Sequence, residues 1–437
     1  MKWLGLVALA VVLGVRLAIG GQLGLSADEA YYWTWSQDLA AGYYDHPPGV
    51  AWLIAAGTGL LGDTELGVRA GGLVAQSAAF AALILAAGEE DRALLALLLC
   101  GLPVLFIGGL LATPDALLLA AWAGCLLAAE RGRWGLAGML AGLAILAKLT
   151  GVLLLAVLAL SGWRRPERVA LAVAWAVVVI SPWIHWSIAH DSVSIAFQLA
   201  HGLGGSDSPG ATGLLEFLGG QLGAAGPIVF LAGVALLLTG RRTQWWWAAA
   251  IPLALFGLAS LRAHGEVGWA APAWLAVAVA LSRADGVLRR AAWAGGWISA
   301  GITALVALHA VHPIWQMPGK DPVDRLRQGS VLGPAVEAWG QPVLTARYQE
   351  ASWVRFYGGV PATTVPDVHR EDQYDLWPRT LPESAVYVRP AGWSGPAEAT
   401  LFYERVTGPA RVQARRDDRL IQGWEVWQVS GLRDRLP

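Results

Sequence analysis

The sequence predicts an α-helical membrane protein with many spans, followed by a small C-terminal domain outside the membrane. Of the 437 residues, 56% are hydrophobic and only 14% are charged, whereas a soluble domain has about 25% charged residues. The mean hydropathy is +0.49. Apolar runs alternate with short polar segments up to about residue 312, and the chain from there to Pro437 has no run long enough to span.

About eleven apolar stretches could cross a bilayer, which requires roughly 20 apolar residues each. We expect the first to be an uncleaved helix rather than a signal peptide, because it is nearly long enough to span and cleavage would release the acidic segment behind it. The short pair around Lys148 could instead be a broken or re-entrant element that lines a cavity. The stretches cover residues 3–20, 66–87, 93–111, 114–129, 134–147, 150–162, 169–188, 226–240, 245–261, 268–282 and 291–311.

The positions of Lys and Arg orient these spans. If Lys2 is cytoplasmic, alternate loops carry the basic residues Arg92, Arg131, Arg133, Arg164, Arg165, Arg168, Arg241, Arg242, Arg283, Arg289 and Arg290. The positive-inside rule then places the polar segments 26–48, 113–115, 148–150, 190–226 and 262–268 on the outer side. We therefore expect the chemistry to lie on the extracytoplasmic face of the cytoplasmic membrane.

Charge and cysteine content exclude several classes of protein. The net charge of -1 and the pI near 6.7 do not provide the basic surface that a nucleic acid requires. Cys100 and Cys125 both lie inside apolar runs without CxxC or His-rich spacing, which argues against a disulfide framework or a thiolate zinc site. Membrane lipids are therefore the expected surroundings of this chain, and nucleic acids are not expected partners.

The C-terminal part, residues 313–437, is large enough for one small domain. Short β-like runs at 342–345, 385–388 and 424–429 alternate with a helical pattern at 348–357, which predicts an α/β or α+β fold. An odd number of spans places this domain outside, and the first outer loop, at 21–65, belongs to the transmembrane part. Residues 1–312 form the transmembrane domain in this interpretation.

The first polar segment, from Ser26 to Pro48, combines acids and aromatic residues at a membrane edge. Ser26 followed by Glu29 fits a capping box at a helix start. Capping would fix Glu29 and leave the Asp28 carboxylate free to accept a proton from an acceptor hydroxyl. An ordinary Asp, with a pKa near 4, is a weak base, so neighbouring groups would have to assist it.

A second acidic pair precedes two prolines, in Asp45-His46-Pro47-Pro48. The prolines stiffen the backbone and disfavour helix at His46, so Asp45 and His46 could face one cavity and share a divalent metal ion or orient the substrate. The alternative is a loop that only starts the amphipathic segment 49–61. Asp115 has two interpretations as well: a first-turn acid behind Pro114 at a helix start, or an acid at the mouth of a bundle.

Basic residues stand near the outer ends of several spans: Arg16, Arg69, Lys148 and Arg262. Each could extend to lipid headgroups. Together they could bind a phosphate at the membrane surface, Arg through two parallel hydrogen bonds and Lys as a point charge. His264 and Glu266, in the loop 262–268, could join that group.

Four motifs carry a resemblance to a known family. The chain resembles bacterial members of glycosyltransferase family 39, which is similar to protein O-mannosyltransferases and to the aminoarabinose lipid A transferases. The resemblance extends over nearly the whole chain. Its motifs are Asp28-Glu29-Ala30-Tyr31-Tyr32-Trp33, Tyr44-Asp45-His46-Pro47-Pro48, Thr113-Pro114-Asp115 and Asp372-Gln373-Tyr374-Asp375-Leu376-Trp377-Pro378.

The resemblance implies a GT-C fold, with a cavity on the outer face beneath the juxtamembrane helices of the first loop. It implies an inverting transfer of a sugar from a polyprenyl-phosphate donor to a hydroxyl or phosphate of a lipid, a glycan or a protein. Asp28 matches the acid that acts as base or positions the acceptor, and Glu29, beside it, is expected at the catalytic centre as well. Asp115 matches an acid on the outer side of a later span.

The remaining motif residues are expected at the substrate. Asp45 and His46, with Tyr44 before them, match an acid-plus-basic pair that is Glu-Lys in the lipid A transferases. Lys148 matches a phosphate contact by its placement. A transporter or flippase for lipid-linked sugars is the alternative, since charged groups in a bundle also mark substrate paths. A membrane scaffold would leave the acidic motifs unexplained.

Overall fold

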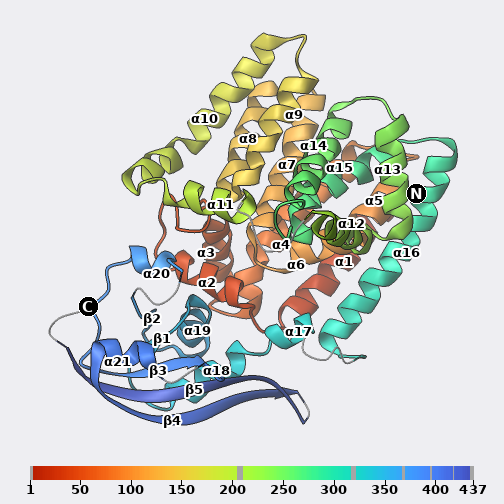
Figure 1. Cartoon of the computed structure of the whole chain (residues 1–437). Coiled ribbons are helices and arrows are strands. Elements are labelled where there is room, and N and C mark those ends of the chain that lie inside the picture. Colours follow the sequence, from red (N-terminus) through yellow and green to blue (C-terminus); the bar gives the residue numbers. More distant parts are fainter. Residues whose placement is uncertain are drawn as a thin grey trace.

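The computed structural model describes residues 3–203, 210–315, 321–366, 370–393, 396–416 and 418–433 of the chain. A helical bundle, which ends with α16, adjoins a smaller domain built around one β-sheet (Figure 1). The second helix, α2, lies between the two parts (Figure 1).

The bundle is formed by elements α1 to α16 and two 3-10 turns. In chain order they are α1 (Leu4–Gly20), α2 (Ala27–Ser36), α3 (Gly49–Leu61), α4 (Glu65–Ala86), α5 (Arg92–Gly101), α6 (Pro103–Leu110), α7 (Pro114–Glu130), α8 (Trp134–Ala147), η1 (Leu149–Val152), α9 (Leu153–Ser161), α10 (Pro166–Ala189), α11 (Val193–Leu203), α12 (Ala211–Ala225), α13 (Pro227–Thr239), α14 (Gln244–Ala259), η2 (Val267–Ala270), α15 (Ala271–Ser282) and α16 (Gly286–Val311).

Among the described helices, α4, α10 and α16 are each long and apolar enough to cross a membrane, and two bent pairs would raise the number to five. The pairs are α5 with α6, bent by 63°, and α12 with α13, bent by 110°. Pro103 and Pro227 begin the second helix of each pair, and a residue before proline avoids the helical conformation. Length and composition therefore do not confirm the predicted eleven spans, because several apolar stretches are broken or short.

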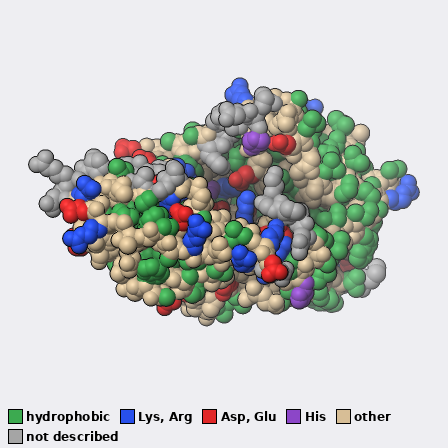
Figure 2. Space-filling view, turned by 60° about the horizontal axis from the view of Figure 1, so that its bottom comes forward, with side chains coloured by type: hydrophobic (Ala, Val, Ile, Leu, Met, Phe, Trp, Pro, Cys, Tyr) green, Lys and Arg blue, Asp and Glu red, His purple; other side chains and the backbone are tan. Residues whose placement is uncertain are grey.

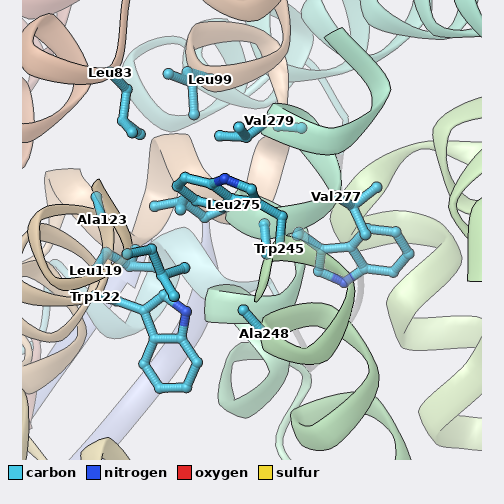
Figure 3. Packing of buried hydrophobic residues seen from close by; sticks show 14 of the residues in the cluster. Leu83, Leu99, Leu119, Trp122, Ala123, Trp245, Ala248, Leu275, Val277 and Val279 are labelled. Atoms are coloured by element: carbon cyan, nitrogen blue, oxygen red, sulfur yellow. The ribbon is translucent and has the colours of Figure 1, made fainter. Parts of the chain in front are cut away.

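The core of the bundle is packed from Leu, Ala and Trp side chains of many helices. Figure 3 shows Trp122, Trp245 and Leu275 from α7, α14 and α15 meeting in one buried cluster. Small residues allow close approach: a Cβ added at Gly138 of α8 would lie 2.1 Å from the carbonyl oxygen of Ala172 in α10. Such packing is typical of helices that associate in membranes.

The C-terminal domain contains a five-stranded sheet in the order β2-β1-β3-β5-β4. β1 (Val343–Thr345) is parallel to β2 (Ala362–Thr364) and β3 (Ser384–Pro390), and β5 (Arg419–Leu432) is antiparallel to β3 and β4 (Tyr403–Arg416). The mixed α and β domain predicted from the sequence is therefore present. The remaining elements are α17 (Pro322–Arg325), α18 (Gly329–Glu337), α19 (Tyr348–Trp353), the π-helical turn η3 (Val354–Gly358), α20 (Gln373–Leu376) and α21 (Ala397–Phe402).

The C-terminal domain is anchored on the segment that precedes and forms α2. The Tyr357 hydroxyl accepts from the backbone N–H of Leu25 (2.7 Å), and the Trp353 indole N–H donates to the Leu25 carbonyl (3.1 Å). Tyr31 and Trp35 of α2 are buried in one cluster with residues of the C-terminal domain. The C-terminal domain thus holds the start of α2, which positions the polar residues of this helix.

Candidate active site

The start of α2 is fixed by the capping box that the sequence predicted. Ser26 Oγ accepts from the backbone N–H of Glu29 (3.3 Å), and Glu29 Oε2 accepts from the backbone N–H of Ser26 (3.0 Å). The neighbouring Asp28 side chain is exposed and points away from this cap, since its Oδ1 accepts from the Tyr348 hydroxyl of α19 (2.9 Å). The capping role expected of Glu29 is therefore confirmed, and Asp28 takes no part in the cap.

Glu29 and Arg69 form an ion pair whose two side chains are 0% exposed. Arg69 Nε and Nη2 donate to the two Glu29 oxygens (2.7 and 2.8 Å), and the backbone N–H of Ala112 adds a third donor (2.9 Å). The other Arg69 hydrogens go to the carbonyls of Gly20, Leu23 and Gly24. This network joins α1, α2, α4 and the segment before α7.

This network corrects two expectations. Burial acts to raise the pKa of Glu29, but the Arg69 guanidinium and the hydrogen bonds hold that pKa below its ordinary value. Glu29 is thus a charged, fully enclosed carboxylate and is not a catalytic base. Arg69 uses all five of its N–H groups on protein oxygens, so it has none to offer to a donor phosphate.

The surroundings of Asp28 differ from those of Glu29 and shift its pKa in the opposite direction. Its side chain reaches solvent, but the surrounding protein displaces much of the bulk water, and this partial burial raises the pKa of the Asp28 carboxyl. The nearby charges of Asp45 and Glu266 raise it further, while the hydrogen bond from Tyr348 and the charge of Arg370 oppose the shift. A carboxylate with a raised pKa accepts a proton more readily near neutral pH.

Asp45 binds a residue of the C-terminal domain that the sequence analysis did not identify. Arg370 Nη1 lies 2.8 Å from Asp45 Oδ1, and the Tyr31 hydroxyl donates to Asp45 Oδ2 (2.7 Å). The Tyr31 oxygen in turn accepts from the backbone N–H of Gln373 (2.6 Å). Asp45 therefore holds the segment 370–373 in place, directly through Arg370 and indirectly through Tyr31.

The two residues beside Asp45 are also involved in contacts within the protein. Gln198 of α11 donates to the Asp45 carbonyl (2.6 Å) and lies 3.3 Å from His46 Nδ1. The Tyr44 hydroxyl donates to Glu371 (3.2 Å), and its backbone N–H donates to Gln373 (2.8 Å). Within the described residues, no three His, Cys, Asp or Glu side chains are grouped as metal ligands, so Asp45 and His46 gain no third ligand from this part of the chain.

Asp115 and Lys148 form an ion pair at a break between helices. Lys148 Nζ lies 3.0 Å from Asp115 Oδ1, with 9% and 19% of the two side chains exposed. Lys148 is extended between α8 and η1, so the helix break expected near it is present. Asp115 follows Pro114 in the first turn of α7, which agrees with its predicted place at a helix start.

Tyr32 lies among three of the acids and connects these two parts of the site. Burial raises its pKa well above the ordinary value, and the charges of Asp28, Asp45 and Asp115 add to that rise. Such an effect requires all three carboxylates to lie near one phenol. On the face of the molecule drawn in Figure 2, acidic and basic side chains surround a hollow near the middle.

The loop that follows α14 brings only part of its predicted group to the site. Glu266 lies near enough to Asp28 to affect its pKa. His264 is exposed and contacts Glu216 through its Nδ1 (2.8 Å). Arg262 is exposed and forms no ion pair with a residue that the structure describes. These two residues therefore remain predicted phosphate ligands without a described contact to Asp28 or Asp45.

Sequence reasoning missed the contribution of the C-terminal domain. Arg370 and Tyr348 contact Asp45 and Asp28 across more than 300 residues of chain. The Asp372 to Pro378 motif was the available signal, since Gln373 lies within it. The motif itself did not indicate which part of the first loop it would contact.

Asp372, which caps α20, provides a test of stability against pH. Burial raises its pKa to about 7, whereas an Asp in an unfolded chain has a pKa of about 3.9. The folded chain thus binds this proton more tightly, and the free energy of unfolding should fall as the pH rises from about 4 to about 7. Asp372→Asn keeps an oxygen for the Tyr374 N–H and cannot ionise. We expect it to melt at a higher temperature than the parent chain at pH 8.

Thermal unfolding of the detergent-solubilised chain between pH 5 and pH 8 measures this effect. Asp418→Asn, at an exposed position, is the control and should follow the parent chain. Identical pH slopes for Asp372→Asn and the parent chain would contradict the assignment of the slope to Asp372.

Known proteins resemble this chain in sequence and in fold. Residues 45–186 match the model of the dolichyl-phosphate-mannose-protein mannosyltransferase family. The lipid A galacturonosyltransferase RgtD of Rhizobium johnstonii is 32% identical over 302 residues, which cover 61% of this chain and 63% of that relative. The chain thus spans less than two thirds of the length of this curated relative.

Two solved structures share the fold across almost the whole chain. They are ArnT of Cupriavidus metallidurans in the apo state and the same protein bound to undecaprenyl phosphate. Each has a TM-score of 0.66 at 17% sequence identity and covers 97% of this chain and 97% of its own. The resemblance inferred from the motifs is confirmed: this membrane protein has the GT-C fold and is similar to the glycosyltransferases of the ArnT type.

Proposed function

We propose that this protein is an inverting glycosyltransferase that moves a sugar from a polyprenyl phosphate to lipid A. The observation that carries the proposal is the position of Asp28, an available carboxylate with a raised pKa, in one group with Asp45, Tyr32 and the Lys148–Asp115 pair. Two comparisons support the proposal: RgtD is a lipid A galacturonosyltransferase, and the ArnT structure that shares this fold binds undecaprenyl phosphate.

The reaction uses one carboxylate and one cation. Asp28 accepts the proton of an acceptor hydroxyl, or orients an acceptor phosphate, while the acceptor oxygen attacks the anomeric carbon of the sugar. The bond from that carbon to the phosphate oxygen breaks, and polyprenyl phosphate leaves with the electron pair. Lys148 stabilises the negative charge on the departing phosphate, and such electrostatic stabilisation is usually a large part of catalysis. Direct attack inverts the anomeric configuration.

Two apolar cavities next to the ion pair support a polyprenyl donor. A cavity of about 550 Å³ is lined by Asp115 together with apolar residues of α6, α15 and α16, such as Ile107, Ala271 and Val306. A second cavity, of about 200 Å³, is lined by Lys148 together with Leu199 and Phe256. An apolar chain in either cavity would bring its phosphate beside Lys148.

The topology belongs to the same proposal. We place the six shorter apolar helices, such as α1, α8 and α14, and the two bent pairs in the membrane with the three long helices, which gives about eleven crossings. The Arg-rich loops then lie in the cytoplasm, and α2 with the C-terminal domain lies on the extracytoplasmic face of the inner membrane.

The test is transfer by the purified full chain. The protein in detergent is given a series of sugars on undecaprenyl phosphate together with lipid A, and products are identified by mass spectrometry. A lipid A species heavier by one sugar residue supports the proposal. Translocation of the donor across liposomes without any glycosylated product would instead indicate the flippase alternative.

Lys148→Ala tests the phosphate contact. The variant removes the cation beside the cavities, so we expect the apparent KM for the donor to rise about tenfold or more, as for the loss of a charge-assisted hydrogen bond. Arg262→Ala is the companion variant. Because Arg262 is exposed and has no described ion pair, its effect on the donor KM should be smaller. Unchanged donor kinetics in both variants would remove these residues from phosphate binding.

A further inference from the structure

A third cavity, separate from the two apolar ones, lies between the end of α2 and the C-terminal domain. Its volume is about 610 Å³. The first loop contributes Gln37 and Asp38, and the C-terminal domain contributes residues before and within β1 and β2 and the segment 377–382. It shares no lining residue with the two apolar cavities beside Lys148 and Asp115.

Arg355 is the main charged group in this cavity. It belongs to the π-helical turn η3, and its guanidinium lies over the rings of Tyr374 (5.8 Å) and Trp377 (5.7 Å). Within the described residues it forms no ion pair and no hydrogen bond, although it is half-buried. Turns of this kind often occur at functional sites. The second basic residue, Arg379, is paired with Asp375 (2.9 Å).

The remaining lining suits a sugar. The Trp377 ring is half-buried and provides an apolar face at the cavity wall, while Thr363, Gln37 and Asp38 provide hydrogen-bonding groups for hydroxyls. An aromatic face beside an Arg without a carboxylate partner favours a ligand that combines a ring with a negative charge. A purely apolar ligand would leave the cation and these polar groups unpaired.

We propose that this cavity binds a negatively charged saccharide, with Arg355 on its phosphate or carboxylate and Trp377 against its ring. This inference rests on the proposed function, because the saccharide would belong to the acceptor glycolipid. The cavity is connected to the active site by aromatic packing: Tyr374 lines it and stacks on Tyr31 (6.0 Å between ring centroids), whose hydroxyl binds Asp45. An acceptor held there would contact Tyr374 and be linked to Asp45 through Tyr31.

The experiment measures binding to the full chain in detergent, without any donor. Glucose 1-phosphate, glucuronate, glucose and inorganic phosphate are titrated by saturation-transfer NMR. We expect at least one of the two anionic sugars to bind, and glucose and phosphate alone to bind at least about tenfold more weakly. Arg355→Gln should weaken that binding by about tenfold or more. Arg405→Gln, an exposed position on β4, is the matched control and should bind like the parent chain.

Two further measurements keep the inference separable from folding and from the proposed function. Arg355→Lys retains the charge and should recover part of the binding that Arg355→Gln loses. If Arg355 had only a structural role, this recovery would not be expected. In transfer assays, Arg355→Gln should raise the acceptor KM and leave kcat and the donor KM unchanged. Unaltered saccharide binding in Arg355→Gln, or glucose binding as tightly as its anionic relatives, would overturn the inference. Transfer activity without Arg355-dependent saccharide binding would refute only the assignment of this cavity. Arg355-dependent binding without any transfer activity would refute only the proposed transferase function.

Discussion

Asp28→Asn is expected to reduce sugar transfer by about 10²- to 10⁴-fold, the usual contribution of a positioned general base. Asn keeps the shape of the side chain and can still accept the hydrogen bond from the Tyr348 hydroxyl, so α2 and α19 should stay in contact. The variant cannot accept a proton from the acceptor. The loss should therefore appear in kcat, with the donor KM nearly unchanged, in the mass-spectrometric transfer assay.

Two controls separate chemistry from folding in this experiment. Asp418→Asn makes the same change at an exposed position in the turn between β4 and β5 and should transfer at the parent rate. The melting temperature of Asp28→Asn should equal or exceed that of the parent chain, because burial penalises the Asp28 charge. Full activity in Asp28→Asn would remove Asp28 from the mechanism.

Local signals in the sequence identified local structure correctly. The Ser26-x-x-Glu29 pattern predicted the capping box, Pro114 predicted the start of α7, and the β-like runs predicted three of the strands. These features depend on residues only a few positions apart, so propensity and capping rules describe them. The split between Asp28 and Glu29 followed from the same rule.

The partners of the acids depend on tertiary structure and could not be predicted in this way. Glu29 meets Arg69 across 40 residues, and Asp45 meets Arg370 across 325. No periodicity indicates which of several basic residues near the membrane edge will be buried against a carboxylate. Arg69 was therefore expected at a phosphate, although burial of Glu29 required a cation beside it.

This buried pair makes Arg69 the position at which substitution should most reduce stability. In Arg69→Met the Glu29 carboxylate would remain enclosed without its cation, and removing one partner of a buried pair typically costs about 3 to 5 kcal/mol. The carbonyls of Gly20, Leu23 and Gly24 would also lose their donors. We expect the melting temperature of the solubilised chain to fall by several degrees or more. Arg131→Met, at an exposed helix end, should leave it unchanged.

The double variant Arg69→Met with Glu29→Gln distinguishes loss of the pair from loss of packing. Glutamine keeps one oxygen, for the N–H group of either Ser26 or Ala112, and carries no charge, so the penalty for an unpaired buried carboxylate disappears. The double variant should melt above Arg69→Met, and the sum of the two single effects should exceed the effect of both together. Because Glu29 caps the helix that carries Asp28, transfer activity should recover along with stability. If the double variant loses as much stability as the two single variants added together, Glu29 and Arg69 act independently.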